Sequence, residues 1–381
     1  MLRLLHTADW HVGKQFGQFD EDVSKKLARD RVSVIEQIMG RARQYSVDAV
    51  LCAGDLFDEP DPGEQWWQAV RDVFVKCDAT GWNRPLIMLP GNHDPLTRDS
   101  VYSSLHPFRH GLPDWVHIVD RDDFELELNE RAVVYATPCH SKAGDNDLAL
   151  MLPNRTENDE RIRIGLVHGS TFDLAGYETN FPVSKDAPQQ RGLDYLAIGD
   201  THSFREVNGN EVAPIVYPSA PEPTRFGESN AGYVAIVTFR RRGTRPRIQQ
   251  EHVARWTWRD VTVQSLDELR SLANEKLQSS VIRVKLDVTV TEREHEEVEH
   301  IVRLLRGTDA VSARAGGLAL DRSGLRVTHD DSDPLDAELP PAILETARLL
   351  EEQSETLGGR EQQVAERAMI ILRRMLREVN R

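Results

Sequence analysis

Five short apolar runs, each ending at a cluster of polar residues, constrain the fold of this chain more than any other feature. The runs occupy residues 2–5, 47–53, 86–89, 162–167 and 195–198. Each has the length of a strand, and Gly or Pro bounds most of them. Helical periodicity lies between some of the runs, at residues 23–44 and 64–77. Strands that alternate with helices predict a sheet of the α/β class.

A second kind of β-pattern lies between the third and fourth runs. Three short apolar stretches within residues 115–137, one with clear alternation, predict a β-meander rather than strands joined by helices. Residues 211–218 and 231–239 predict a further pair of strands. We therefore expect an α/β fold with a mixed sheet, most simply two packed mixed β-sheets flanked by helices.

The composition changes after residue 255. A helix, a strand, a second charged helix and a return strand within residues 260–330 predict a compact α+β unit. Two helical patterns follow at residues 341–357 and 361–379, and a Gly-Gly pair separates them, which is typical of a helical hairpin. We therefore predict three parts: a main domain at residues 1–255, a small α+β capping domain at 256–338 and a C-terminal helical hairpin at 339–381.

The net charge argues against one way of binding nucleic acid. The chain has 47 Lys and Arg against 62 Asp and Glu, a formal net charge of −15. A protein that coats nucleic acid by bulk basicity needs clustered Lys and Arg, so this chain does not belong to that class. One local basic cluster exists, formed by Arg240, Arg241, Arg242, Arg245 and Arg247. Its default interpretation is a solvated hairpin tip, and contact with a DNA backbone is the alternative.

The sequence also indicates a compartment. No window approaches 18 consecutive apolar residues, so we expect no transmembrane helix. The apolar run at the N-terminus is too short for a signal peptide, and we expect it to form a buried first strand. The chain has three cysteines, Cys52, Cys77 and Cys139. This odd, sparse set argues against a disulfide framework and indicates a reducing cytoplasm.

Hard ligands and imidazoles follow the five apolar runs. The set comprises Asp9, His11, Asp55, Asn92, His168, Asp200 and His202. Sites in open α/β sheets form outside the carboxyl ends of strands, where these side chains would converge. Carboxylates, imidazoles and an amide together suit manganese, iron or zinc. Seven ligands are too many for one tetrahedral ion but suit two ions about 3.5–4 Å apart, with Asp55 as the natural bridge.

The order of the motifs resembles that of the calcineurin-like metallophosphoesterase superfamily. The matching motifs are Asp9-x-His11, Gly54-Asp55, Gly91-Asn-His-Asp94, His168 and Gly199-x-x-His202. Within that superfamily, residues 8–14, 53–58 and 216–228 resemble the SbcD-type DNA repair nucleases. The likeness covers roughly residues 1–255.

The resemblance implies a role for each site residue. Asp9, His11, Asp55 and His202 would hold a first divalent metal ion, and Asp55, Asn92, His168 and Asp200 a second. His93 would face the substrate and protonate the leaving 3′ oxygen or stabilise the transition state, and its alternative role is structural. Asp94 would orient His93.

One departure from the family pattern lies at position 200. Asp200 stands where the family usually has a histidine. A carboxylate is a harder ligand, so we expect manganese or magnesium to be favoured, with manganese first and iron or zinc also accepted. The alternative is a weakened second metal site with reduced activity.

The resemblance implies a DNA nuclease subunit with 3′→5′ exonuclease and endonuclease activity in DNA end processing and repair. An SMC-like ATPase of the SbcC type would be its partner, and a homodimer is also open. Residues 364, 368, 371, 372, 375, 376 and 379 form an apolar stripe that would either dock on this ATPase or pack within the chain. Two alternatives remain: a phosphodiesterase acting on small nucleotides or other phosphoesters, and a catalytically weak scaffold.

Overall fold

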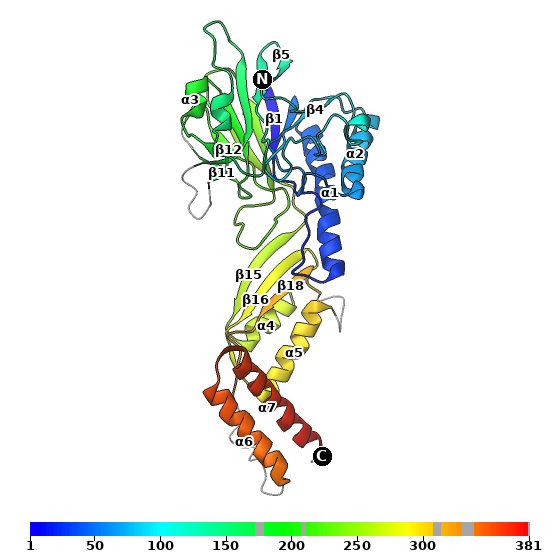
Figure 1. Cartoon of the computed structure of the whole chain (residues 1–381), viewed down its shortest axis with the longest axis vertical. Coiled ribbons are helices and arrows are strands. Elements are labelled where there is room, and N and C mark those ends of the chain that lie inside the picture. The colour runs from blue at the N-terminus through cyan, green and yellow to red at the C-terminus, as the bar shows by residue number, and fades with distance from the viewer. Residues whose placement is uncertain (172–178, 208–210, 308–313, 329–338, 380–381) are drawn as a thin grey trace. The chain divides into compact units, whose positions relative to one another are not determined.

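The computed structural model of the chain describes residues 1–171, 179–207, 211–307, 314–328 and 339–379 (Figure 1). The chain divides into two compact units. The first comprises residues 1–260 together with 277–283 and 315–319, and the second comprises residues 261–276, 284–314 and 320–381. The predicted domain boundary at residue 338 lies outside the described residues.

Two six-stranded mixed sheets form the first unit. The order in the first sheet is β14 (Arg247–His252), β13 (Tyr233–Phe239), β1 (Leu2–Thr7), β2 (Ala49–Cys52), β3 (Leu86–Met88) and β4 (Val116–Ile118). The order in the second sheet is β11 (Arg205–Glu206), β12 (Ile215–Tyr217), β10 (Tyr195–Gly199), β7 (Ile162–His168), β6 (Ala132–Ala136) and β5 (Phe124–Asn129). In the first sheet β1, β2, β3 and β4 run parallel, and β13 is antiparallel to both of its neighbours. In the second sheet β12, β10, β7 and β6 run parallel, and antiparallel strands β11 and β5 lie at the two edges. The predicted fold class is therefore confirmed.

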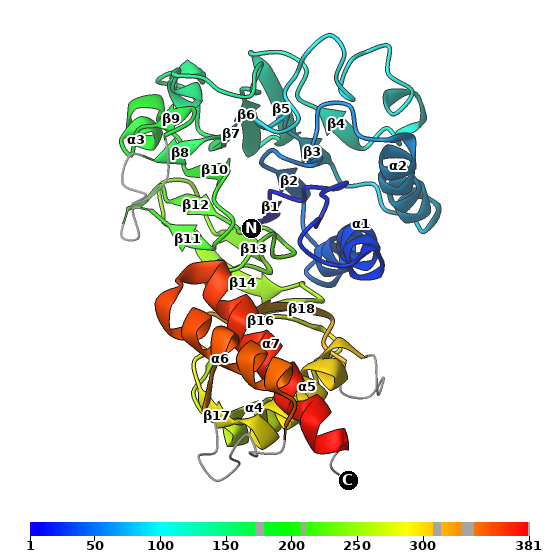
Figure 2. The same ribbon diagram turned by 60° about the horizontal axis from the view of Figure 1, so that its bottom comes forward.

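Apolar side chains fill the space between the two sheets. Leu4, Leu51 and Ile87 from the first sheet belong to the same buried cluster as Ile164 and Leu166 from the second. The outer faces are also covered, which explains why the strands are continuous apolar runs rather than alternating ones. Figure 2 shows helices α1 (Glu21–Gln44) and α2 (Glu64–Ala79) on one side of the sheets and α3 (Ala187–Arg191) on the other.

Both ends of helix α1 carry residues that favour a helix terminus. The Asp20 side chain accepts a hydrogen bond from the backbone N–H of Val23 at 2.9 Å and so caps the first turn. Glu21 and Asp22 lie in that turn, whereas Arg41 and Arg43 lie in the last turn. Both placements favour the helix dipole.

The strand partners differ from the prediction in two places. Strand β4 pairs in parallel with β3 in the first sheet, whereas β5 and β6 form an antiparallel pair in the second, so the predicted β-meander is wrong. Strands β12 and β13, predicted as a pair, belong to different sheets. A short apolar run indicates that a strand is buried, but it carries no information about which sheet receives it.

The remaining elements are short in the first unit and mostly helical in the second. The first unit also contains η1 (Arg109–Gly111), η2 (Leu148–Met151), β8 (Ser170–Thr171) and β9 (Pro182–Val183). Strands β15 (Thr257–Val263), β16 (Ser280–Leu286) and β18 (Gly317–Asp321) form a three-stranded sheet. The second unit contains α4 (Leu266–Ala273), α5 (Glu292–Arg306), β17 (Thr289–Thr291) and β19 (Arg326–Thr328).

The second unit ends in the expected pair of helices, α6 (Pro341–Thr356) and α7 (Gly359–Val379). Ala347 of α6 and Ala365 and Met369 of α7 are buried. Gly359 has φ +66°, a conformation that suits glycine at a sharp turn between helices. None of the described helices has both the length and the apolar character needed to cross a membrane.

Candidate metal centre

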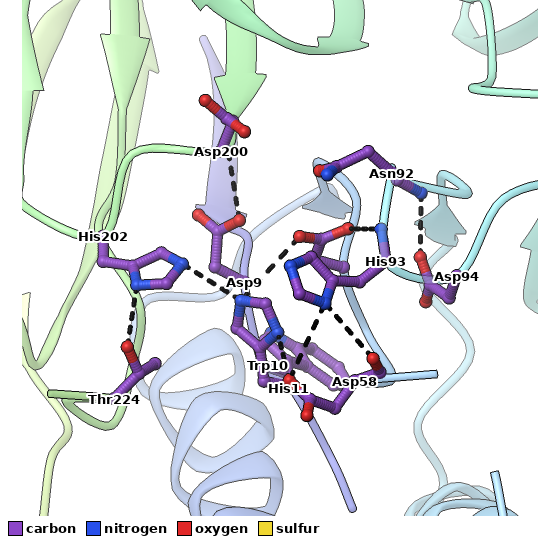
Figure 3. A network of polar contacts seen from close by, with 12 residues as sticks. Asp9, Trp10, His11, Asp58, Asn92, His93, Asp94, Asp200, His202 and Thr224 are labelled. Carbon is purple, nitrogen blue, oxygen red and sulfur yellow. Dashed lines mark hydrogen bonds and ion pairs between the residues drawn. The ribbon is translucent and has the colours of Figure 1, made fainter. Parts of the chain in front are cut away.

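The carboxyl ends of the parallel strands bring the predicted site residues together. Asp9 and His11 follow β1, Asp55 follows β2, and Asn92 follows β3 in the first sheet; His168 ends β7, and Asp200 and His202 follow β10 in the second. The Nδ1 atom of His168 lies 2.8 Å from the carbonyl oxygen of Ala53, which joins the two sheets at this edge. All seven predicted ligands therefore come from the carboxyl ends of strands in the two sheets. Figure 3 labels five of them, Asp9, His11, Asn92, Asp200 and His202.

Three imidazole Nε2 atoms face the interior of this cluster. The Nε2 atoms of His11 and His202 lie 3.0 Å apart. The Nε2 atom of His168 lies 2.8 Å from Oδ1 of Asn92 and 3.5 Å from Oδ2 of Asp55. That same Asp55 oxygen lies 3.8 Å from Nε2 of His11. Asp55 is therefore placed between two histidines, as a bridging ligand must be.

The other ring nitrogen of each of these histidines, Nδ1, faces an oxygen atom that can accept a hydrogen bond. Nδ1 of His11 lies 3.0 Å from Oδ1 of Asp58, and Nδ1 of His168 faces the Ala53 carbonyl. Nδ1 of His202 lies 2.7 Å from Oε1 of Glu228 and 2.9 Å from the hydroxyl of Thr224. An acceptor at Nδ1 selects the tautomer whose Nε2 carries a lone pair, and metal-ligating histidines are held in this way.

Asp9 has the surroundings that a metal ligand needs. Its side chain is fully buried, and its Oδ1 accepts a hydrogen bond from the backbone N–H of Asp200 at 3.0 Å. Its Oδ2 has no hydrogen-bond partner among the described residues. A buried carboxylate oxygen without a partner carries a large desolvation cost, which a cation would offset. Together with the inward-facing imidazoles, Asp9 fits a divalent metal ion.

The backbone is strained at four of the candidate ligands. Asp9 (φ 55°), His11 (φ 46°), Asp55 (φ 52°) and Asp200 (φ 102°) adopt positive φ values, which non-glycine residues rarely do. Such residues cost of order 1–3 kcal/mol each and concentrate at functional sites.

Two glycines make room for the cluster. A Cβ atom at Gly54, which has φ +94°, would lie 2.2 Å from Nδ1 of His168. A Cβ atom at Gly91 would lie 2.2 Å from Oδ1 of Asp55. A side chain at either position would clash with a site residue, so the Gly54-Asp55 and Gly91-Asn-His-Asp94 motifs need glycine there.

Burial and mutual charge shift the pKa values of the cluster in opposite directions. Burial raises the pKa of Asp9 to about 6, although His202 and His168 oppose the shift. Burial alone would lower the pKa of His168, but Asp55, Asp9 and Asp200 outweigh it and raise the value to about 9. Burial lowers the pKa of His11 to about 3. The site therefore concentrates groups whose charges depend on one another.

His93 lies at the open side of the cluster. Its side chain is 43% exposed, and its ring packs edge-on against that of His11 at 4.8 Å between centroids. Its backbone N–H donates to Oδ1 of Asp55 at 2.9 Å, and its Nδ1 lies 3.2 Å from the carbonyl oxygen of Asp58. The ring is thus anchored to the cluster and remains accessible.

The expected partnership between Asp94 and the His93 ring is wrong. The buried Asp94 carboxylate accepts hydrogen bonds from the N–H of Phe57 at 2.8 Å, the N–H of Gly91 at 2.9 Å and the hydroxyl of Tyr102 at 2.6 Å. Asp94 therefore fixes the loops around the site, and Asp58 is the residue beside His93 (Figure 3).

The sequence did not assign a role to four further residues at the site. Asp58 and Glu228 lie inside recognised motifs, so the motif was a signal for them. The Ser170 hydroxyl donates to Oδ2 of Asp200, and no pattern pointed to it. The buried Arg31 of α1 donates to the carbonyl oxygens of Trp10 at 2.9 Å and of residues 11, 222 and 223 at 3.0–3.2 Å. An arginine within a helical pattern gives no sign of this role.

Comparison with known proteins agrees with this geometry. The model of the calcineurin-like phosphoesterase family matches residues 2–204, more than half of the chain. The chain belongs to this family. It is therefore a metal-dependent phosphoesterase, a hydrolase of a family that uses divalent metal ions.

Relatives of the chain are distant. The uncharacterized metallophosphoesterase YhaO of Bacillus subtilis is 24% identical over 243 residues, which cover 62% of this chain and 57% of that protein. The SbcD subunit of nuclease SbcCD of Escherichia coli is 26% identical over 283 residues, 62% of this chain and 65% of that protein. The chain thus spans 57–65% of the length of these relatives. A dimetal phosphatase from Danio rerio matches with a TM-score of 0.37 and 11% identity, over 65% of this chain and 98% of that one.

Proposed function

We propose that this phosphoesterase is a DNA nuclease subunit with two metal ions, active as a 3′→5′ exonuclease and as an endonuclease. The observation that carries the proposal is the arrangement of His11, His168 and His202, whose Nε2 atoms all face the buried carboxylates of Asp9 and Asp55. The similarity to the SbcD subunit of nuclease SbcCD supports DNA as the substrate.

The two proposed metal sites share Asp55. Asp9, His11, Asp55 and His202 would hold the first ion, and Asp55, Asn92, His168 and Asp200 the second. When bound, such ions lower the pKa of a coordinated water and neutralise charge on the phosphate. Because Asp200 supplies a carboxylate, we propose manganese as the preferred ion, with magnesium next and iron or zinc accepted through the imidazoles.

His93 is the proposed general acid. Its exposed ring can reach a phosphodiester that the site residues hold, and Nδ1 faces the Asp58 carbonyl, so the protonated ring presents Nε2–H outward. That proton would pass to the leaving 3′ oxygen. The backbone N–H of His93 donates to Asp55, which ties the position of the ring to the proposed bridging ligand.

An SMC-like ATPase of the SbcC type is the proposed partner. Val364, Ile371 and Met375 of α7 are 61%, 52% and 59% exposed within the described chain. Their spacing puts them along one side of the helix, as in helices that dock in apolar grooves. The side chain of Val379, part of the same predicted stripe, lies outside the described residues. Deleting residues 339–381 should abolish co-purification of the ATPase without changing metal binding.

Two further parts of the proposal concern the cell and the assembly. The three cysteines, Cys52, Cys77 and Cys139, are free thiols, which supports a reducing cytoplasm. A homodimer of the phosphoesterase domain is also proposed, by the resemblance alone. Analytical ultracentrifugation of the full chain would measure its assembly state.

Cleavage of end-labelled DNA tests the proposed activity. Wild type, His93→Ala and the surface control His110→Ala would be incubated with duplex and single-stranded DNA and manganese. We expect metal-dependent cutting by wild type and the control and loss of cutting in His93→Ala. Hydrolysis of a small phosphodiester such as bis(p-nitrophenyl) phosphate without any DNA cleavage would instead favour the small-substrate alternative. Inactivity on both would favour a scaffold or an obligate partner.

A further inference from the structure

A pocket of about 870 Å³ opens at the end of the first sheet opposite the candidate metal centre. Arg3 of β1, Thr238 of β13 and Arg247 of β14 are directly paired across three neighbouring strands, so their side chains share one face. Strand β1 runs from this end to Asp9. At about 3.3 Å per residue the two ends lie roughly 20 Å apart.

Arginine dominates the lining of this pocket. Arg3, Arg240, Arg241, Arg245 and Arg247 all contribute, and neither Asp nor Glu does. The chain as a whole has more acidic residues than basic ones, 62 against 47. Five arginines in a lining that includes no described Asp or Glu form a local concentration of positive charge on an acidic protein, although Arg245 pairs with Glu206 outside the lining. Such patches attract anions.

Two of these arginines are free to bind a ligand. Arg3 donates to the carbonyl of Tyr45, Arg245 pairs with Glu206, and Arg247 lies 3.4 Å from the side-chain oxygen of Gln249. Among the residues that the structure describes, the guanidinium groups of Arg240 and Arg241 form no hydrogen bond and no ion pair. Both side chains are exposed.

The positive surface continues past the pocket. A second hollow of about 500 Å³ shares Met1, Arg240 and Arg241 with the first and adds Arg131 and Arg242. It also contains two acidic residues, at positions 130 and 160, and the latter pairs with Arg242. Two adjoining hollows on either side of a pair of free arginines suit an extended anion better than a single small one.

We infer that this arginine-lined pocket binds the phosphate groups of a nucleic-acid strand, at a place separate from the metal centre. The guanidinium fork matches phosphate oxygens in a bidentate manner, and it keeps its charge at any physiological pH. The inference rests on the proposed nuclease function and adds a second contact for the same substrate. The pocket contributes affinity and takes no part in bond cleavage.

Salt-dependent binding of DNA tests the inference. The full-length double variant Arg240→Ala/Arg241→Ala is compared with Arg29→Ala/Arg84→Ala, which removes the same charge from exposed positions outside the pocket. Fluorescence anisotropy with a labelled DNA oligonucleotide, in EDTA to prevent cleavage, gives Kd between about 50 and 500 mM salt. Each lost phosphate contact lowers the slope of log Kd against log salt by about 0.7–0.9. We expect the pocket variant to lose about 1.4–1.8 in slope and at least about tenfold in affinity near 100 mM salt.

Three further measurements separate the possible outcomes. DNA should protect Arg240 and Arg241 of the wild type from phenylglyoxal, as read by mass spectrometry. Hydrolysis of bis(p-nitrophenyl) phosphate with manganese should be unchanged in the pocket variant, because the metal centre is intact. Calorimetry with inorganic pyrophosphate tests for a small anion.

The inference is wrong if wild type binds DNA while the pocket variant keeps the affinity and slope of the control; the proposed nuclease function then stands. Pyrophosphate binding that the pocket variant loses, without DNA binding by wild type, would make this a small-phosphate site and overturn the nucleic-acid assignment. Wild type that neither binds nor cuts DNA, yet hydrolyses the small diester, removes the proposed function and this inference with it.

Discussion

Asp58 should set the metal affinity of the site, although it is not one of the candidate ligands. Its Oδ1 lies 3.0 Å from Nδ1 of His11 and 3.3 Å from Nζ of Lys14. His11 is buried, and a hydrogen bond to a charged group in such a place is worth about 1.5–3 kcal/mol. The Lys14 pair is partly exposed and contributes below about 1 kcal/mol.

Asp58→Asn keeps the shape of the side chain and removes its charge. The neutral amide holds His11 less firmly in the tautomer that turns Nε2 inward, so we expect manganese to bind about 10–100-fold more weakly, equivalent to about 1.4–2.7 kcal/mol. Saturating manganese should restore most of the turnover on a small phosphodiester, because His93 and the ligands are unchanged.

Isothermal titration calorimetry of the metal-free protein with manganese measures this effect. The matched control is Asp61→Asn, the same substitution at a carboxylate that is 79% exposed and 3.9 Å from its nearest imidazole. Equal manganese affinity for Asp58→Asn, the control and wild type would refute the reasoning. A turnover loss that persists at saturating manganese would instead assign Asp58 to the positioning of His93.

Three further predictions follow from the same structure. Asp200→Ala should leave one bound manganese where wild type has two, as counted by inductively coupled plasma mass spectrometry; two ions in the variant would remove Asp200 from the ligand set. Burial lowers the pKa of His6 from 6.5 to about 3. As the pH falls from 6.5 toward 3, the unfolded state takes up a proton that the folded state does not, so the free energy of unfolding is full above pH 6.5 and decreases below it. Below pH 6, urea unfolding in EDTA should therefore lose up to about 1.4 kcal/mol per pH unit more in wild type than in His6→Gln, and identical slopes would contradict this. Leu166→Ala, in the core between the sheets, should cost about 2–5 kcal/mol of unfolding free energy, against less than about 0.5 kcal/mol for Leu105→Ala, whose side chain is 81% exposed.

The sequence identified which segments form buried strands, but it did not identify which strands pair with one another. Continuous apolar runs identified the parallel strands because both faces of each sheet are covered. The same information could not assign β4 or β12 to a sheet, since pairing depends on how connecting segments cross the molecule. The helices were predicted closely because apolar periodicity is a local property, as in residues 23–44, which lie within α1.

The site shows a similar division. The rule that sites form at the carboxyl ends of strands gathered seven residues that the structure does bring together, and their role as ligands stays a prediction. Roles that depend on side-chain direction were beyond the sequence. His93 and Asp94 are adjacent in the chain, yet the ring lies at the open side of the cluster and the carboxylate is buried among backbone N–H groups.

The clustering of these residues at the carboxyl ends of the strands lowers the stability of the fold. The candidate ligands at these strand ends include three buried or half-buried carboxylates and three imidazoles, and four of these residues have positive φ. A protein tolerates such strain where the surrounding structure holds it, and here Arg31 and Asp94 tie the loops that carry Trp10 and Gly91. A bound divalent cation would act in the same direction, because a ligand present at 100 times its Kd stabilises the folded state by about 2.7 kcal/mol. The residues that hold the loops and those that would hold the ions thus support one another, so that loss of either group weakens both the fold and the site.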